Sequence, residues 1–105
     1  MSTTTTAITP LDLARILEAS TEYKLNANDL HCLCVIASAG ADSLTMNTTA
    51  VAMKLSSAAI TNIADKLESW GFISRRTARV DRRVIWLEIT ERGKHVLADI
   101  LNSAS

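Results

Sequence analysis

Residues 55–83 read LSSAAITNIADKLESWGFISRRTARVDRR, and this stretch decides the fold. Its first part has apolar residues at helical spacing, which places them on one arc of about 100°: Ile60, Ile63, Ala64 and Leu67. The remaining sides carry small or polar residues: Ser57, Ala58, Thr61, Asn62, Asp65 and Lys66. The pattern predicts a helix from Ser57 to Trp70 that ends at Gly71, with one face buried and one face available.

The second part of the stretch predicts a β-hairpin. Residues 72–77 and 84–89 are rich in β-branched and aromatic side chains, and a polar segment connects them. Between residues 75 and 83 there are five arginines and a single acid, Asp81: Arg75, Arg76, Arg79, Arg82 and Arg83. A local field of this strength attracts polyanions, whereas the alternative interpretation is a solvated hairpin.

Two more helices precede this stretch. A short helix is expected over residues 48–55, after a segment at 44–46. An earlier helix is apolar on nearly every side over residues 30–37, so we expect it at the centre of the fold. Its start signal is Asn26 or Asn28, and Gly40 ends it.

Capping signals predict a helix near each end of the chain. Thr9 can cap a helix whose first position is Pro10, and the apolar spacing continues to about Tyr23. Thr90 can cap a last helix that runs from residue 91 to about Leu101.

The order of these elements predicts the fold class. Four helices, a hairpin and a last helix form a mainly α fold with a small β-hairpin, which is the order of a winged helix-turn-helix. We expect residues 9–105 to form one such domain, since a chain of this length can build a single core. The Thr-rich lead, residues 1–8, is expected to be disordered.

Composition and charge exclude several classes of protein. The chain has 11 basic and 11 acidic side chains, but residues 1–44 carry a net charge of −3 and residues 45–105 a net charge of +3. No apolar run approaches the ~20 residues that cross a bilayer, and no secretory signal is evident, so a cytoplasmic protein without a membrane partner is expected. The sequence shows no nucleophile–base pair and no Gly-rich phosphate loop, which indicates a protein that is not an enzyme.

The cysteines, histidines and tryptophans indicate packing. Cys32 and Cys34 lie in an apolar helix, which favours core packing over redox sensing and keeps the two from bonding to each other. His31 and His95 have no partner at ligand spacing, so neither a metal nor another cofactor is expected. Trp86 is expected to pack on its strand, with part of its ring exposed.

The helix predicted over residues 57–70 has the size and surface that the major groove of DNA admits. Ser56 is expected to cap it, leaving further backbone N–H groups for a phosphate. The candidate contacts on this helix are Ser57, Ala58, Thr61, Asn62 and Lys66. Asn62 can form paired hydrogen bonds with adenine. The candidate contacts on the hairpin are Arg75, Arg76, Arg79, Arg82 and Arg83, with Arg79 and Arg82 expected at the tip, near a minor groove.

Residues 44–94 resemble the DNA-binding core of the MarR family of bacterial regulators. The matching stretches, in order and with matching gaps, are Leu44-Thr45-Met46, Ala50, Leu55-Ser56, Ile60-Thr61, Asp65-Lys66-Leu67-Glu68, Gly71-Phe72-Ile73, Arg75-Arg76, Asp81-Arg82-Arg83 and Leu87-Glu88-Ile89-Thr90-Glu91-Arg92-Gly93. The resemblance implies a homodimer that binds a pseudo-palindromic operator. It also implies that Asp81 orients a neighbouring arginine of the hairpin.

Two departures from the family pattern affect these expectations. Lys54 stands where many relatives have glycine in the turn, which is tolerable if that residue need not adopt a positive φ. The last helix ends about where relatives continue into a longer pair of helices. We therefore expect the first and last helices to form the dimer, and binding of a small-molecule effector stays open.

The hypothesis that results is a transcriptional regulator, a repressor that binds double-stranded DNA with strong salt dependence and a large contribution from DNA shape. A second hypothesis is a plasmid or phage adaptor that assembles on repeated DNA sites. A third is a protein-interaction module whose arginines meet an acidic partner, and it predicts no protection of any DNA sequence.

Overall fold

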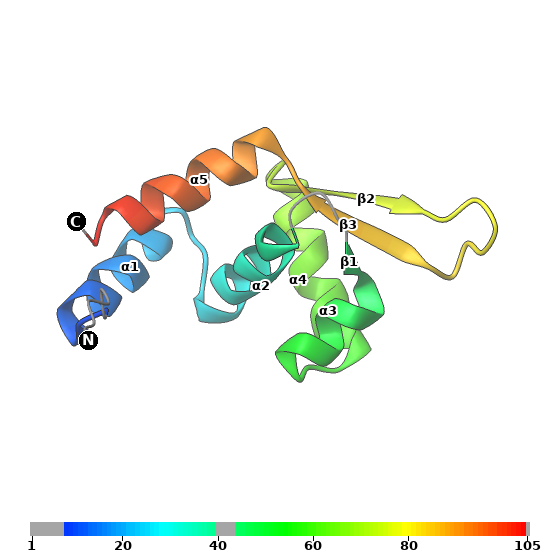
Figure 1. Cartoon of the computed structure of the whole chain (residues 1–105), viewed down its shortest axis with the longest axis horizontal. Coiled ribbons are helices and arrows are strands. Elements are labelled where there is room, and N and C mark those ends of the chain that lie inside the picture. The colour runs from blue at the N-terminus through cyan, green and yellow to red at the C-terminus, as the bar shows by residue number, and fades with distance from the viewer. Residues whose placement is uncertain (1–7, 40–43, 105) are drawn as a thin grey trace, which may run out of the picture.

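The computed structural model describes residues 8–39 and 44–104. The elements in these residues are α1 (Pro10–Glu22), α2 (Ala27–Ser38), β1 (Leu44–Thr45), α3 (Met46–Met53), α4 (Ser57–Ser69), β2 (Ile73–Thr77), β3 (Ile85–Ile89) and α5 (Glu91–Asn102). Figure 1 shows a mainly helical molecule with a long hairpin, which confirms the predicted winged helix-turn-helix class. Residues 1–7 of the expected lead and Gly40, the expected helix end, lie outside the described residues.

Side-chain caps fix the starts of the first, second and last helices. The Thr9 hydroxyl accepts a hydrogen bond from the Asp12 backbone N–H, and the Asp12 carboxylate accepts one from the Thr9 N–H. Asn26 and Asp29 form the same reciprocal pair at α2, which decides between the two predicted starts of that helix. Thr90 caps α5 as predicted. Each cap satisfies backbone donors that a helix start otherwise leaves free.

The apolar α2 lies at the centre of the fold, as its composition predicts. It contacts all four other helices and β3. Cys32 and Leu33 are fully buried, and Ile36 is nearly so. The other elements contribute further buried side chains to the same core: Ile16, Ile60, Leu67, Ile73, Leu87 and Ile100.

A third strand, not predicted from the sequence, extends the hairpin into a small sheet. β1 pairs antiparallel with β3 at Leu44↔Leu87 and Thr45↔Trp86, and the strand order is β1-β3-β2. Thr45 also caps α3. The helix therefore begins at Met46 and ends at Met53, two residues earlier at each end than the range expected from the sequence.

The two ends of the hairpin are tied together where it leaves the core. Gly71, with φ of 79°, turns the chain from α4 into β2. Thr90, just after β3, donates its hydroxyl hydrogen to the Gly71 carbonyl (2.5 Å) and its N–H to the Phe72 carbonyl (3.0 Å). Gly93 of α5 lies so close that an added β-carbon would be 2.1 Å from the Phe72 carbonyl oxygen. The hairpin therefore has a fixed base.

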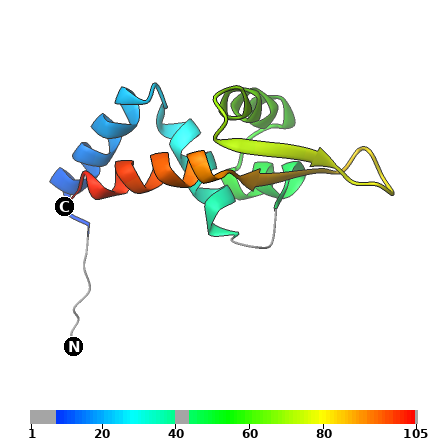
Figure 2. The same ribbon diagram turned by 90° about the horizontal axis from the view of Figure 1, so that it is seen from above.

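The molecule is elongated, with extents of 47 × 34 × 26 Å. Figures 1 and 2 show α1 beside α5 at one end and the hairpin loop at the opposite end. Four leucines of α1 and α5 are exposed to solvent: Leu11, Leu13, Leu17 and Leu101. Within residues 8–39 and 44–104, no helix has the length and apolar character that a membrane crossing requires.

Candidate nucleic-acid interface

The helices α3 and α4 form the helix-turn-helix, with the turn at the lower edge of the molecule in Figure 1. Ser56 caps α4 as predicted, because its hydroxyl accepts the Ala59 backbone N–H at 3.1 Å. Lys54 ends α3 with φ of 57° and ψ of 42°. The condition under which a lysine is easily tolerated here, a φ that is not positive, is therefore not met. The left-handed conformation lets the next N–H, that of Leu55, reach the Ala50 carbonyl at 3.0 Å and close the helix end.

The face of α4 that points away from the core carries the predicted small and polar residues. In the N-terminal half of the helix its exposed members are Ser57, Ala58, Thr61 and Asn62, and Asp65 is exposed further along. The Thr61 hydroxyl donates to the Ser57 carbonyl at 2.8 Å, so its oxygen can still accept a hydrogen bond. On the opposite side Ile60, Ala64 and Leu67 are buried in the core. The α4 face, defined by the four exposed residues of the N-terminal half, is thus held by packing behind it.

Lys66 lies apart from the α4 face and is engaged inside the protein. Its Nζ is 2.5 Å from the Asp29 Oδ2 and 5.2 Å from the centre of the Trp70 ring. The Asp29 side chain is only 2% exposed, and a carboxylate so buried requires a hydrogen-bonded cation. Lys66 therefore links α4 to the start of α2.

Arg75 is also engaged with carboxylates of the protein. Its Nη2 lies 2.6 Å from the Glu68 Oε1 and 2.8 Å from the Asp65 Oδ1, and both acids belong to α4. The hydrogen bond to Glu68, followed by that to Asp65, raises the pKa of Arg75. This arginine ties β2 to α4 and so sets the position of the hairpin relative to the α4 face.

Arg76 lies on the sheet surface, directly across from Trp86 in the strand register. Its guanidinium carbon is 5.8 Å from the centre of the Trp86 ring, and its Nε is 3.4 Å from the Glu88 Oε1. Trp86 is half-buried, which agrees with the packing predicted for it. Because the Arg76–Glu88 pair is exposed, it adds little stability and leaves the arginine available to a stronger anion.

The loop between β2 and β3 exposes Arg79, Val80 and Arg82. Arg83 turns back onto Asp81, with its Nε and Nη2 at 3.0 and 3.1 Å from the two carboxylate oxygens. Hydrogen bonds from the Arg83 side chain and then from its backbone lower the pKa of Asp81. Asp81 thus orients Arg83, which is the role that the family resemblance implies. Arg79 and Arg82 form no ion pair with any carboxylate in the described part of the chain.

Sequence reasoning missed the carboxylates that hold two of the predicted contact residues. Asp65 and Glu68 are three residues apart, which places them on one side of a helix, and this spacing was a usable signal for a partner strand. Asp29 gave no such signal, because it lies 37 residues before Lys66. Its position next to Lys66 depends on how α2 packs against α4.

Of the two cysteine thiols, that of Cys32 is buried in the core and that of Cys34 is partly buried against it. Burial, with a smaller contribution from Asp29, raises the pKa of Cys32 to about 12. Burial also raises the pKa of Cys34. A raised pKa disfavours the reactive thiolate, which agrees with the core packing that the sequence favours over redox sensing. Within the described ranges, no group of three or more His, Cys, Asp or Glu side chains could hold a metal ion.

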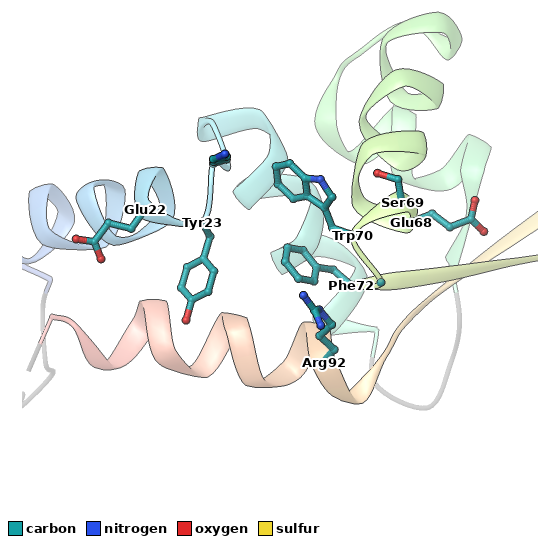
Figure 3. A pocket seen from close by; sticks show the side chains of 9 residues that line it. Glu22, Tyr23, Glu68, Ser69, Trp70, Phe72 and Arg92 are labelled. Carbon is teal, nitrogen blue, oxygen red and sulfur yellow. The ribbon is translucent and has the colours of Figure 1, made fainter.

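An open pocket of about 760 Å³ lies where the ends of α1 and α4 meet the start of α5 (Figure 3). The rings of Trp70 and Phe72 meet edge to face with centres 5.8 Å apart, and the guanidinium carbon of Arg92 is 5.7 Å from the centre of the Phe72 ring. The other lining residues are Glu22, Tyr23, Lys24, Glu68, Ser69 and Gly71. The pocket adjoins the C-terminal end of α4, whereas the α4 face lies in its N-terminal half.

Comparison with known proteins agrees with this arrangement. The transcriptional repressor MprA of Escherichia coli (strain K12) is 46% identical over 41 residues, which cover 39% of this chain and 23% of the repressor. The crystal structure of the YusO protein from Bacillus subtilis is 28% identical, with a TM-score of 0.78 over 90% of this chain and 65% of YusO. The S. aureus MepR–DNA complex has the same fold, with a TM-score of 0.79 at 19% identity, over 87% of this chain and 73% of MepR.

The chain therefore matches only parts of these longer relatives. The sequence match spans less than a quarter of MprA, and the structural match spans just under two thirds of YusO. The family model described as "MarR family" matches residues 25–85, from the end of the α1–α2 turn to the first residue of β3. This is more than half of the chain, and the protein belongs to the MarR family.

Proposed function

We propose that this protein is a sequence-specific DNA-binding regulator of transcription, a repressor that binds a pseudo-palindromic operator as a homodimer. Its site of action is the cytoplasm, where bacterial operators are, and it performs no catalysis. One observation carries the proposal: Arg75 joins the hairpin, whose loop exposes arginines, to α4, whose outer face is exposed.

The α4 face is suited to the major groove, which is about 12 Å wide and admits a helix. Thr61 and Asn62 carry the acceptor and amide groups that can meet base edges. Ser57 and Ala58 are small enough to let the start of α4 approach the DNA backbone closely. Because few long side chains extend from this face, the sequence preference arises largely from DNA shape.

The hairpin loop supplies the contacts beside the major groove. Arg79 and Arg82 are exposed and without a carboxylate partner in the described residues, so an anion need not displace an internal ion pair. A narrow minor groove concentrates negative potential and attracts such arginines. Arg76 and Arg83 have exposed partners, so they can exchange them for phosphates at small cost.

Among the relatives, MprA is named a transcriptional repressor, and MepR has been solved in complex with DNA. Both facts support the proposal for this chain. The sequence suggested Lys66 and Arg75 as DNA contacts, whereas the proposal gives them a positioning role. Their cations already bind Asp29, Asp65 and Glu68, and these ion pairs position α4 and β2.

The proposal is tested by selecting duplexes from a random library and measuring their binding to the Arg79→Ala/Arg82→Ala variant across a salt series. We expect lower affinity and a shallower slope of log K against log salt, by about 0.9 for each phosphate that the variant no longer neutralises. Arg15→Ala, a change of an exposed cation on α1, is the control and should bind like the wild type.

An unchanged slope in the double variant would reject the assignment of the hairpin. If the selection enriches no duplex at all, the result would favour the hypothesis of a protein-interaction module whose arginines meet an acidic partner. Enrichment of tandem copies of one short site, with cooperative filling, would favour the adaptor that assembles on repeated sites.

A further inference from the structure

Lys54 adopts a backbone conformation that glycine adopts far more easily. With φ of 57° and ψ of 42° it lies in the left-handed region, where the β-carbon approaches the following carbonyl. Its N–H donates to the Val51 carbonyl at 3.1 Å, and that of Leu55 donates to the Ala50 carbonyl. Glycine would make the same backbone bonds without the steric cost. The backbone geometry alone favours glycine, so we look for an interaction of the lysine side chain that compensates for the steric cost.

Lys24 has the same geometry at the end of α1, with φ of 62°. Its N–H donates to the Thr21 carbonyl at 2.8 Å, and the Leu25 N–H donates to the Ser20 carbonyl at 2.9 Å. A cation is favoured near the last carbonyls of any helix, and this effect applies equally to both lysines. The two residues differ in location: Lys24 lines the pocket of Figure 3, whereas Lys54 opens the turn that leads into α4.

The pairing of the cations separates the two lysines further. All 11 basic residues lie in the described ranges, and Lys66, Arg75, Arg76, Arg83 and Lys94 form ion pairs. Six have no ion pair with a described carboxylate: Arg15, Lys24, Lys54, Arg79, Arg82 and Arg92. Of these six, Lys54, Arg79 and Arg82 lie on the α3–α4 turn and the hairpin loop, and all three are exposed.

We propose that Lys54 binds a phosphate of the DNA backbone at the edge of the groove that α4 enters. This inference rests on the proposed function and adds a contact that the sequence-based candidates did not include. Lys54 is exposed and lies two residues before Ser56, the cap of α4, so it is close in the chain to the helix start that would approach the DNA backbone. The cost of the left-handed lysine is offset in the complex by this charge-assisted contact.

The test compares Lys54→Gly with Lys24→Gly in two measurements. Both variants should raise Tm by several degrees, since each removes a β-carbon from a left-handed position. Only Lys54→Gly should weaken binding to the selected duplex, with a salt slope shallower by about 0.9 per subunit. Lys54→Arg should retain the wild-type slope, because it keeps the charge.

Lys54→Gly is expected to raise Tm and to weaken DNA binding, so a folding defect would not explain the loss of binding. If Lys54→Gly binds with the wild-type affinity and slope while the Arg79→Ala/Arg82→Ala variant does not, the phosphate contact is overturned and the proposed function stands. If the wild-type protein binds no selected duplex, the proposed function fails, and this contact fails with it. Equal weakening by Lys24→Gly would also overturn the inference, because the effect would then not depend on location.

Discussion

Asp81 and Arg83 form a fork in the loop of the hairpin. The Arg83 side chain is 90% exposed, so the pair contributes little to the stability of the fold. Its effect is on direction: the carboxylate binds both the guanidinium and the backbone N–H of Arg83. One arginine of the loop is thereby held back, while Arg79 and Arg82 on either side of Asp81 stay extended into solvent.

The pKa of Asp81 provides a direct measurement of this fork. Because the Arg83 bonds favour the carboxylate, its pKa lies below the ordinary 3.8. The contribution of the fork is complete above that ordinary value and is lost as the pH falls through the lowered pKa. We expect Arg83→Met to move the Asp81 midpoint upward, as followed by NMR titration of the carboxyl carbon. An unchanged midpoint would mean that the fork does not persist in solution.

Side chains of the same type serve different purposes according to their partners. The sequence predicts the arginine cluster and the exposed polar residues of α4, because each depends on local composition and helical spacing. It does not separate Arg75, which binds Asp65 and Glu68, from Arg79. That distinction depends on the packing of β2 against α4, which the composition of a nine-residue window does not determine.

At the scale of the elements, the strength of the local signal decides what can be predicted. The helices have capping residues and a 3.6-residue period, and their starts at Pro10, Ser57 and Glu91 agree with the sequence. β1 has only two residues, too few for an alternating pattern, and it forms because β3 offers an edge 41 residues or more away. The start of α3 shifts with it, since Thr45 serves both elements.

The contact between α5 and the base of the hairpin predicts a strong effect of Gly93→Ala. A β-carbon there would be 2.1 Å from the Phe72 carbonyl oxygen and 2.8 Å from the Ile89 Cγ1, so α5 or the hairpin must move. We expect the free energy of unfolding to fall by more than about 3 kcal/mol, as measured by urea denaturation.

Gly71→Ala is the matched control for this variant. Its added β-carbon would meet the Arg92 side chain at 3.4 Å, an ordinary contact, but φ of 79° is unfavourable for alanine. The expected decrease in unfolding free energy is about 1–2 kcal/mol. A Gly93→Ala variant no less stable than Gly71→Ala would show that α5 is not fitted against Phe72 as described.

At the scale of the whole molecule, the two ends have different surfaces. The hairpin end exposes arginines, whereas the end formed by α1 and α5 exposes Leu11, Leu13, Leu17 and Leu101. Exposed leucines at such density are typical of a surface that another protein covers. A dimer formed through α1 and α5, as expected from the sequence, would bury this end and direct both hairpins outward.

Leu13→Glu/Leu17→Glu tests this arrangement. Both side chains are at least 40% exposed, so the monomer should tolerate the change, whereas a dimer would have to bury the new charges. We expect sedimentation of a dimer for the wild type and of a monomer for the variant. Val51→Glu, the same kind of change at an exposed residue of α3, should remain dimeric. A wild type that sediments as a monomer would rule out the homodimer.

The two hydrogen bonds from Thr90 to the carbonyls of Gly71 and Phe72 also have an evolutionary consequence. They hold the two strands together where the hairpin joins the core, so changes confined to the loop, residues 78–84, leave the core contacts of the fold in place. Loops that are longer, shorter or differently charged can therefore arise in evolution while the rest of the fold is retained. An experiment that exchanges this loop between members of the family could change which DNA sequence each of them binds.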